Sequence, residues 1–276
     1  MAGCFKPQYI DVSPSYGQMT MAFTHQDGAF YDAAHGAQLY YEQKGNPQGL
    51  PLLFLHGGTC DMSSFNAMVE VLGEHYRCIG LDTRGHGRST LGHAPLSYAL
   101  LQQDVESLLT ALGVESCHVI GHSDGGIVAL RMAAARTCLL NKIVVIGAHW
   151  TIAEDASVAE LYADVSPEFW RQHLPQLVDQ YERLNREPDF DRLLARLSAM
   201  WLDDSGDGYP GNRVRDINEE VLVVRGDDDP LVSLAHTVAL VDQFKEGHFL
   251  NIPFCGHSVH EEAPKLVIRA VSEFLA

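Results

Sequence analysis

The sequence has no stretch typical of a membrane or secreted protein. No apolar run is long enough to span a bilayer, and the N-terminus lacks a basic segment followed by an apolar one. The six cysteines form no C-x-x-C pair and have no regular spacing, which favours free thiols over disulfides or a metal site. We therefore expect a cytoplasmic protein that is not attached to a membrane.

Positive charge is also scarce. The chain has 19 basic and 36 acidic residues, and its formal net charge at pH 7 is -17. Nucleic acids and anionic membranes attract basic surfaces, so this balance argues against both as partners. The 276 residues are 46% hydrophobic, which is enough for one large α/β domain with an insertion.

Short apolar runs alternate with helical segments over most of the chain. Strand-like runs occupy 37–42, 50–55, 76–81, 117–120, 142–146, 220–225 and 248–252. Helical patterns cover 65–72, 97–112, 127–135, 233–244 and the last residues up to 276. This alternation predicts a mostly parallel sheet with helices on both faces.

The alternation stops between residues 150 and 214, where only helical segments occur (158–162, 167–184 and 190–201). We therefore expect an α/β core made of residues 21–149 and 215–276, a helical cap at 150–214, and an irregular extension at 1–20. Trp150 directly follows a strand's carboxyl end, where open α/β sheets bind ligands, so we expect it to line the pocket. Trp201 is expected to belong to the cap's own core.

One motif, G-x-S-x-G, lies between an apolar strand and a helix. It runs from Gly121 to Gly125 with Ser123 at its centre. A strand that turns into a helix within so few residues leaves the serine at a strained, exposed corner beside the helix N-terminus. This context predicts that Ser123 is a nucleophile.

A serine hydroxyl needs a base and a third group that orients the base. His257 follows the strand at 248–252 and is the expected base, with His260 as the competing candidate. Three aspartates follow the preceding strand. Asp229 is the expected acid, with Asp228 as the alternative.

The negative charge that forms on the substrate oxygen requires two backbone N–H donors. We expect one from Asp124, the residue after the nucleophile. We expect the other from Gly58, in the glycine loop that follows the strand at 50–55. Gly57 in the same loop is expected to contact the substrate.

The order of glycine loop, G-x-S-x-G, helical insertion, aspartate loop and histidine resembles the α/β-hydrolase superfamily from about residue 30 to 276. Two further segments carry the same resemblance: Asp82-x-Arg84-Gly85-His86-Gly87-x-Ser89, and Gly256-His257 followed by Glu261 and Pro264. The resemblance implies an eight-stranded, mostly parallel sheet and a Ser-His-Asp triad.

Three shorter segments look like the valacyclovir-hydrolase (biphenyl-hydrolase-like) group: Ser123-Asp124-Gly125-Gly126-Ile127, Gly147-Ala148 and Asp164-Val165-Ser166. The glycine loop departs from that group. The resemblance implies cleavage of α-amino-acid esters, with Asp124 holding the substrate's ammonium group. Alternatively, Asp124 only caps the positive end of its helix.

Together these features predict a serine hydrolase that cleaves small-molecule carboxylic esters through an acyl-enzyme, as a monomer or homodimer, with no metal or organic cofactor. The same triad also serves lactonases, thioesterases, amidases, C–C bond hydrolases and perhydrolases. A ligand sensor that retains the triad is the alternative from a different class.

Overall fold

The computed structural model describes residues 21–136, 139–152 and 156–276. The extension expected at residues 1–20 lies outside this range. Within the described residues, no helix has the length and apolar character needed to cross a membrane.

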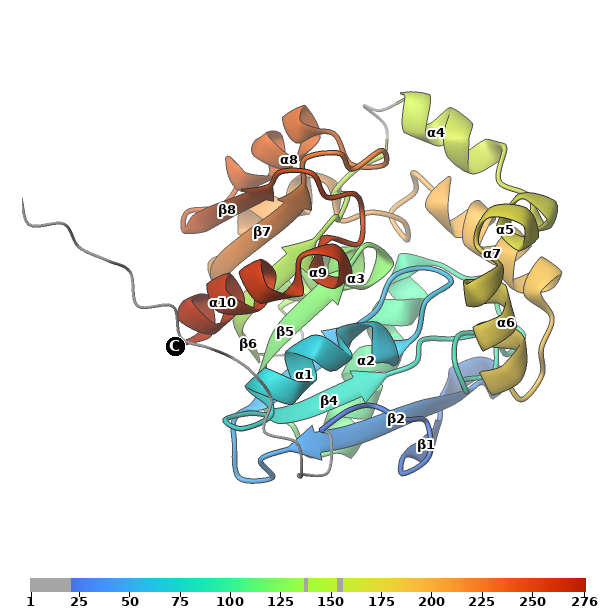
Figure 1. The fold of residues 1–276 in the computed structure, drawn as a ribbon, viewed down its shortest axis with the longest axis horizontal. Helices are drawn as coiled ribbons and strands as arrows, with labels where there is room; N and C mark the ends of the chain where they lie inside the picture. The colour runs from blue at the N-terminus through green and yellow to red at the C-terminus, as the bar shows by residue number, and fades with distance from the viewer. Residues whose placement is uncertain (1–20, 137–138, 153–155) are drawn as a thin grey trace, which may run out of the picture.

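The described residues form one eight-stranded sheet, as expected (Figure 1). Its strands, in chain order, are β1 (Ala29–Asp32), β2 (Gln38–Gly45), β3 (Pro51–Leu55), β4 (Arg77–Leu81), β5 (Ser116–His122), β6 (Leu139–Ile146), β7 (Glu220–Gly226) and β8 (Gly247–Ile252). Their order in the sheet is β1-β2-β4-β3-β5-β6-β7-β8. The pairs β1–β2 and β2–β4 are antiparallel, and all the others are parallel. The six parallel strands, β3 to β8, therefore bring their carboxyl ends to one edge of the sheet.

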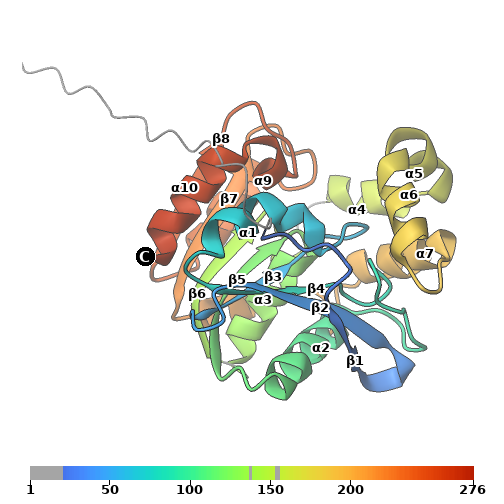
Figure 2. The ribbon, with the colours of Figure 1, turned by 60° about the horizontal axis from the view of Figure 1, so that its bottom comes forward.

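Helices cover both faces of this sheet (Figure 2). The core helices are α1 (Asn66–Leu72), α2 (Tyr98–Ala111), α3 (Asp124–Ala135), α8 (Leu234–Val241), α9 (Val259–Glu262) and α10 (Pro264–Leu275). Short 3₁₀ helices occupy Ala34–Gly36, Met62–Phe65 and Gly211–Asp216. Strand β3 shows how the faces divide, because Leu53 and Leu55 pack in the cluster with α2 and α3 whereas Leu52 and Phe54 pack with α1 and α10.

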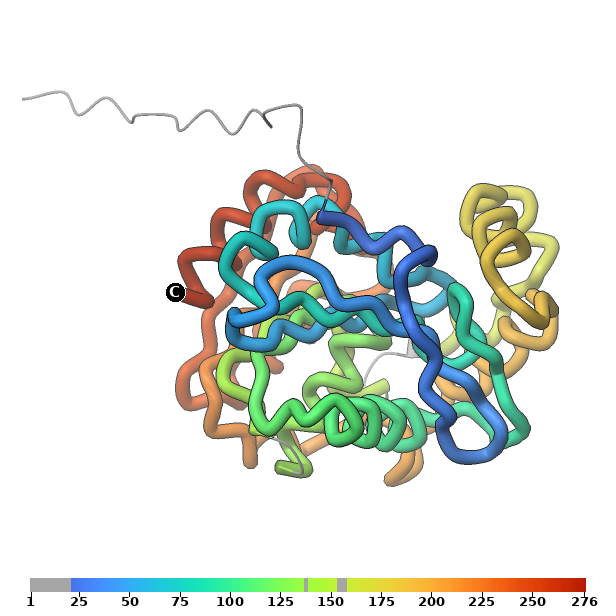
Figure 3. Tube along the Cα trace, turned by 90° about the horizontal axis from the view of Figure 1, so that it is seen from below, coloured from blue at the N-terminus to red at the C-terminus, as the bar shows by residue number. Residues whose placement is uncertain are grey.

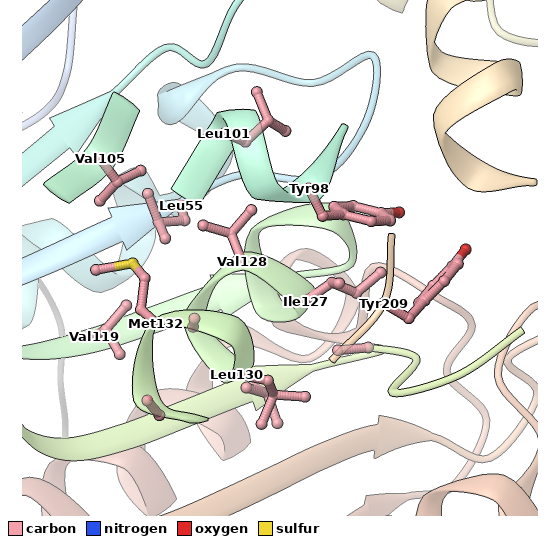
Figure 4. Close-up of a cluster of buried hydrophobic side chains, with 14 of the residues drawn as sticks. Leu55, Tyr98, Leu101, Val105, Val119, Ile127, Val128, Leu130, Met132 and Tyr209 are labelled. Atoms are coloured by element: carbon pink, nitrogen blue, oxygen red, sulfur yellow. The ribbon is translucent and has the colours of Figure 1, made fainter. Parts of the chain in front are cut away.

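The cluster on the α2–α3 face fixes the position of the G-x-S-x-G turn. Figure 4 shows Leu101 and Val105 of α2 facing Val128 and Met132 of α3, with Leu55 of β3 beside them. Leu55 is fully buried. Dense packing of this kind leaves α3, and the turn that starts it, little freedom to shift.

Between β6 and β7 the described residues form four α-helices: α4 (Ala156–Ala163), α5 (Pro167–His173), α6 (Pro175–Leu184) and α7 (Phe190–Trp201). They form a separate block at one side of the core in Figures 1 and 3, and we call them the inserted helices. The single helix predicted over 167–184 is wrong, because Leu174 leaves the helical region (φ -132°) and Pro175 starts a new helix. Proline cannot donate the backbone hydrogen bond that a continuous helix needs there.

The segment after β4 is held by two buried contacts. Arg84, which is completely buried, forms an ion pair with Asp104 of α2 and donates to the carbonyl of Ala34. On the other side, the amide of Asn185 donates to the carbonyls of Gly85, Gly87 and Ser89 at 2.9–3.2 Å. The segment therefore joins α2 to the end of α6.

We predict that Asp104→Ala lowers the free energy of unfolding by about 3–5 kcal/mol, because it leaves the guanidinium of Arg84 buried without its carboxylate. Urea titration measures the loss. Burial raises the pKa of Asp104 despite the bond to Arg84, so the pair itself adds little net stability. An Arg84→Met, Asp104→Leu double variant should recover most of the loss, and a double variant as unstable as the single one would contradict this account.

Candidate active site

Ser123 occupies the sharp turn that the motif predicts. Its backbone has φ 49° and ψ -116°, a strained conformation for a residue with a side chain, and α3 starts at the next residue. Neighbouring glycines make the turn possible. A Cβ on Gly121 would lie 2.4 Å from the carbonyl oxygen of Gly125, and a Cβ on Gly125 would lie 2.0 Å from that of Leu55. Any larger residue would push the turn away from β3.

His257 and Asp229 form a hydrogen-bonded pair. Nδ1 of His257 lies 3.0 and 3.1 Å from the two carboxylate oxygens of Asp229, whose side chain is fully buried. Burial alone would raise the pKa of Asp229. The hydrogen bond and charge of His257, together with the N–H groups of Leu231 and Val232, lower it below its usual value. The carboxylate is therefore ionised at neutral pH and fixes the proton of His257 on Nδ1.

The other ring nitrogen of His257 is ready to take a proton. Nε2 is buried and has no hydrogen-bond partner among the described residues. Ser123 lines the same cavity as His257, so the structure brings the expected nucleophile and base to one site. The serine–histidine hydrogen bond itself is often long in unliganded enzymes and tightens with substrate.

The two rival candidates lie elsewhere. His260 is 1% exposed, packs its ring 4.5 Å from that of His122, and does not line the cavity that contains Ser123. Asp228 is exposed, and only Asp229 contacts the histidine. The His122 ring lies between the two histidines, and its Nε2 is 3.2 Å from the carbonyl oxygen of His257. In the sequence, the one feature that indicates this contact of His122 is that it directly precedes Ser123.

Two backbone N–H groups beside Ser123 lack acceptors. Gly125 donates to the carbonyl of His56, but the N–H groups of Gly58 and Asp124 bond to no acceptor within the described part of the chain. Asp124 is the first residue of α3, where helix N–H groups are free and the helix dipole is positive. These two donors are the ones expected for an oxyanion.

The loop that carries Gly58 is held by the segment after β4. His86 accepts the N–H of Thr59 at 3.0 Å, and His56 accepts the N–H of Thr83 at 3.0 Å. Burial lowers the pKa of His86 to about 3, so the ring stays neutral and keeps a lone pair for this bond. The D-x-R-G-H-G segment thus has a role in shaping the glycine loop.

Ser123 and His257 line a cavity of about 540 Å³, a size typical of small-molecule sites. The glycine loop contributes Gly57, Gly58, Thr59 and Cys60. The inserted helices and the turns between them contribute an apolar wall: Leu161, Tyr162, Val165, Phe169, Trp170, Leu174, Leu177 and Trp201. Gly57 therefore lies where a substrate contact was expected.

The tryptophans show one difference from the expectation. Trp201 belongs to the buried cluster that includes the inserted helices, as expected, and it also lines the cavity, whereas Trp150 is 7% exposed and is not among the lining residues. The backbone N–H of Trp150 donates to Nε2 of His236, and its carbonyl accepts from the N–H of Gly211. Position after a strand does not indicate whether a side chain reaches the cavity.

Charge in the cavity is negative. Glu262 is the only acidic residue among the described lining residues, which include no lysine or arginine. A substrate carboxylate would thus find no lysine or arginine on the walls that the structure describes.

A separate group could in principle bind a metal. His25, Asp61 and Asp82 are buried, and their ligand-type atoms lie within 4.8 Å of one another. Burial alone would lower the pKa of His25, but the hydrogen bond and charge of Asp82 and the charge of Asp61 raise it. Asp82 also accepts the backbone N–H groups of Met62 and Arg88. The contacts of the His25 ring with the two carboxylates account for this arrangement without a metal ion.

Comparison with known proteins places the chain in a family. Residues 52–270 match the alpha/beta hydrolase family. The chain belongs to that family.

Individual relatives are distant and differ in name. An sn-1-specific diacylglycerol lipase from Mus musculus is 26% identical over 257 residues, which cover 82% of this chain and 80% of the relative. A meta-cleavage product hydrolase from Pseudomonas fluorescens has a TM-score of 0.76 at 20% identity, over 90% of this chain and 97% of that one. An enol-lactonase from Burkholderia xenovorans has a TM-score of 0.71 at 19% identity, over 90% and 99%. These comparisons confirm the fold and a hydrolase of this family, and they leave the bond cleaved open.

Because His86 is neutral in the folded protein, we predict that folding stability depends on pH through this residue. Its pKa is lower in the folded state than in the unfolded chain, so folding stability is complete above about pH 6.5 and is lost as the pH falls toward 3. His86→Gln keeps a hydrogen-bond acceptor without the titration. Between pH 6.5 and 4.5 the wild type should lose up to about 1.4 kcal/mol per pH unit more than the variant. Urea unfolding across this range measures both slopes, and parallel slopes would contradict a neutral His86.

Proposed function

We propose that this protein is a serine hydrolase that cleaves carboxylic esters through an acyl-enzyme. One observation supports this most strongly. Ser123, on its strained turn, shares a cavity with the unpartnered Nε2 of His257, and Asp229 fixes the other nitrogen of that ring. This is the set of groups that activates a serine hydroxyl.

In the proposed reaction, Ser123 attacks the ester carbonyl while Nε2 of His257 takes the hydroxyl proton. The N–H groups of Gly58 and Asp124 stabilise the negative oxygen. His257 then protonates the leaving alcohol, and Asp229 stabilises the imidazolium. Water attacks the acyl-enzyme by the reverse sequence and releases the carboxylic acid.

The cavity supports an uncharged, mainly apolar ester. Its wall of aromatic and aliphatic side chains comes from the inserted helices, which we propose form the cap that selects the substrate. No arginine or lysine lines the described part of the cavity, so an ester without a carboxylate fits it better than an acidic substrate. A volume of about 540 Å³ leaves room for an acyl group much larger than acetyl.

An α-amino group on the substrate would need an acceptor close to Ser123. The Asp124 carboxylate is the candidate that the family resemblance implies. However, Tyr98 and Trp201 already donate to it, and it is not among the residues lining the cavity. The placement argues against this role, and we propose that esters without an α-amino group are cleaved at least as well.

We predict that Ser123→Ala lowers kcat for p-nitrophenyl butyrate by about 10⁶-fold, because the acyl-enzyme cannot form. Release of p-nitrophenol measures the rate. The control is Ser272→Ala, which removes a hydroxyl that bonds within α10, remote from the cavity. Turnover by the Ser123 variant that equals the control's would remove this serine from the mechanism.

A second prediction concerns the α-amino group. Wild-type kcat/KM for the p-nitrophenyl ester of an aminoacyl group should not exceed that for its des-amino analogue, because the Asp124 carboxylate is already bonded. Stopped-flow assays at matched pH give both values. A preference of tenfold or more for the amino ester, abolished by Asp124→Asn, would instead support the ammonium role.

A further inference from the structure

The carboxylate beside the nucleophile is buried inside the protein. Asp124 is 6% exposed. Its Oδ1 accepts the hydroxyl of Tyr98 at 2.8 Å, and the indole Nε1 of Trp201 lies 3.0 Å from both Oδ1 and Oδ2. The two donors come from α2 in the core and from α7 in the inserted helices. One side chain next to Ser123 therefore bonds to both parts of the molecule.

The indole of Trp201 also packs 5.2 Å from the ring of Tyr162. It lies at the last residue of α7 and lines the cavity. Its carbonyl oxygen accepts the hydroxyl of Tyr209 at 2.8 Å, and the ring of Tyr209 lies 5.1 Å from that of Tyr98. Figure 4 shows these two tyrosines side by side. Asp124 and the two tyrosines thus hold Trp201 by its side chain and its backbone.

The same contact extends to the glycine loop. A Cβ on Gly58 would lie 2.7 Å from Oδ2 of Asp124 and 2.7 Å from Cζ2 of Trp201. Gly58 therefore packs directly against the bonded pair, with its free N–H at the site expected for the oxyanion. A substrate carbonyl bound there would place its acyl group close to the indole.

We propose that the Asp124 side chain is a positioning residue that fixes the indole of Trp201 as one wall of the acyl pocket, so that this pair determines which acyl groups the enzyme accepts. The inference rests on the proposed ester hydrolysis. It gives Asp124 two separate tasks, since its backbone N–H faces the oxyanion and its carboxylate holds the wall.

Both oxygens of the Asp124 side chain accept hydrogen bonds from neutral donors. Burial is the largest influence and raises the pKa of Asp124 overall, although the hydrogen bonds from Trp201 and Tyr98 act in the opposite direction. Hydrogen bonds to a carboxylate are stronger than those between neutral groups, and a buried carboxylate that lost one would be left with an unsatisfied oxygen. The indole is therefore held in one orientation.

Trp170 offers a matched control. It also lines the cavity, but its indole nitrogen is buried without a hydrogen-bond partner in the described residues. Replacing Trp170 changes the cavity wall without touching Asp124. Any coupling to Asp124 should therefore be found at Trp201 and not at Trp170.

The experiment measures kcat/KM for p-nitrophenyl acetate, butyrate and octanoate in wild type and in the Asp124→Asn, Trp201→Phe and Trp170→Phe variants. Asp124→Asn is also combined with each tryptophan variant. The readout is selectivity, the ratio of the octanoate to the acetate value. Pocket changes of this size typically alter discrimination by about 10-fold or more. We expect the ratio to rise by about that factor in Trp201→Phe, and to rise by a smaller factor in Asp124→Asn.

The double variants decide between a wall and a general structural role. With Trp201→Phe, the Asp124→Asn effect on the ratio should disappear, because its target is gone; with Trp170→Phe it should remain in full. Equal loss of kcat/KM on all three esters, or an effect of Asp124→Asn that persists without the Trp201 indole, would overturn the proposal.

A second measurement does not depend on turnover. Urea unfolding of the same variants should show coupling between Asp124 and Trp201 and additive effects between Asp124 and Trp170. A wild type that hydrolyses no ester but shows this coupling would refute the proposed function and, with it, the acyl pocket. An active wild type with additive effects in both cycles would refute the positioning role alone.

Discussion

The strained turn at Ser123 is the constraint on which the rest of the structure depends. A residue with a side chain at φ 49° and ψ -116° is unfavourable by itself, at a cost of about 1–3 kcal/mol. The packing of α3 against α2 and β3 holds the turn in place, and the glycines at 121 and 125 allow the backbones to approach closely enough. In return, the turn exposes one hydroxyl and one free N–H at the same edge of the sheet where β7 and β8 deliver Asp229 and His257.

Around that turn, the groups proposed for catalysis and those proposed for substrate selection belong to different parts of the molecule. Backbone groups and the aspartate–histidine pair belong to the sheet and its loops, which resist displacement because they are largely buried and tied by hydrogen bonds such as those of His56 and Asp229. The apolar wall of the cavity belongs to the inserted helices. Asp124 joins the two, since its carboxylate connects α2 and α7 directly behind the glycine loop. Under the proposed function, substrate selection can therefore change in the helices while the catalytic groups stay fixed.

Sequence patterns predicted most of the fold and the placing of the candidate catalytic residues, because both depend on local signals. Seven of the strands coincide with strand-like runs in the sequence, and Ser123, Asp229 and His257 each follow one of them. The short edge strand β1 lacks such a run, and the break at Pro175 was hidden inside one helical pattern. The contact between Asp124 and Trp201 joins residues 77 positions apart, so no local pattern could indicate it. Trp150 and Trp201 were assigned by position along the chain, whereas packing decides which side chain reaches the cavity.

The most direct test of the account is to locate the reactive residue with a fluorophosphonate, which bonds covalently to an activated serine. Intact-mass analysis should show one phosphonyl group per chain, and peptide mapping should place it on Ser123. The adduct should be lost in His257→Ala, whose serine has no base. A wild-type chain that stays unmodified, or that carries the label on another residue, would contradict the central claim.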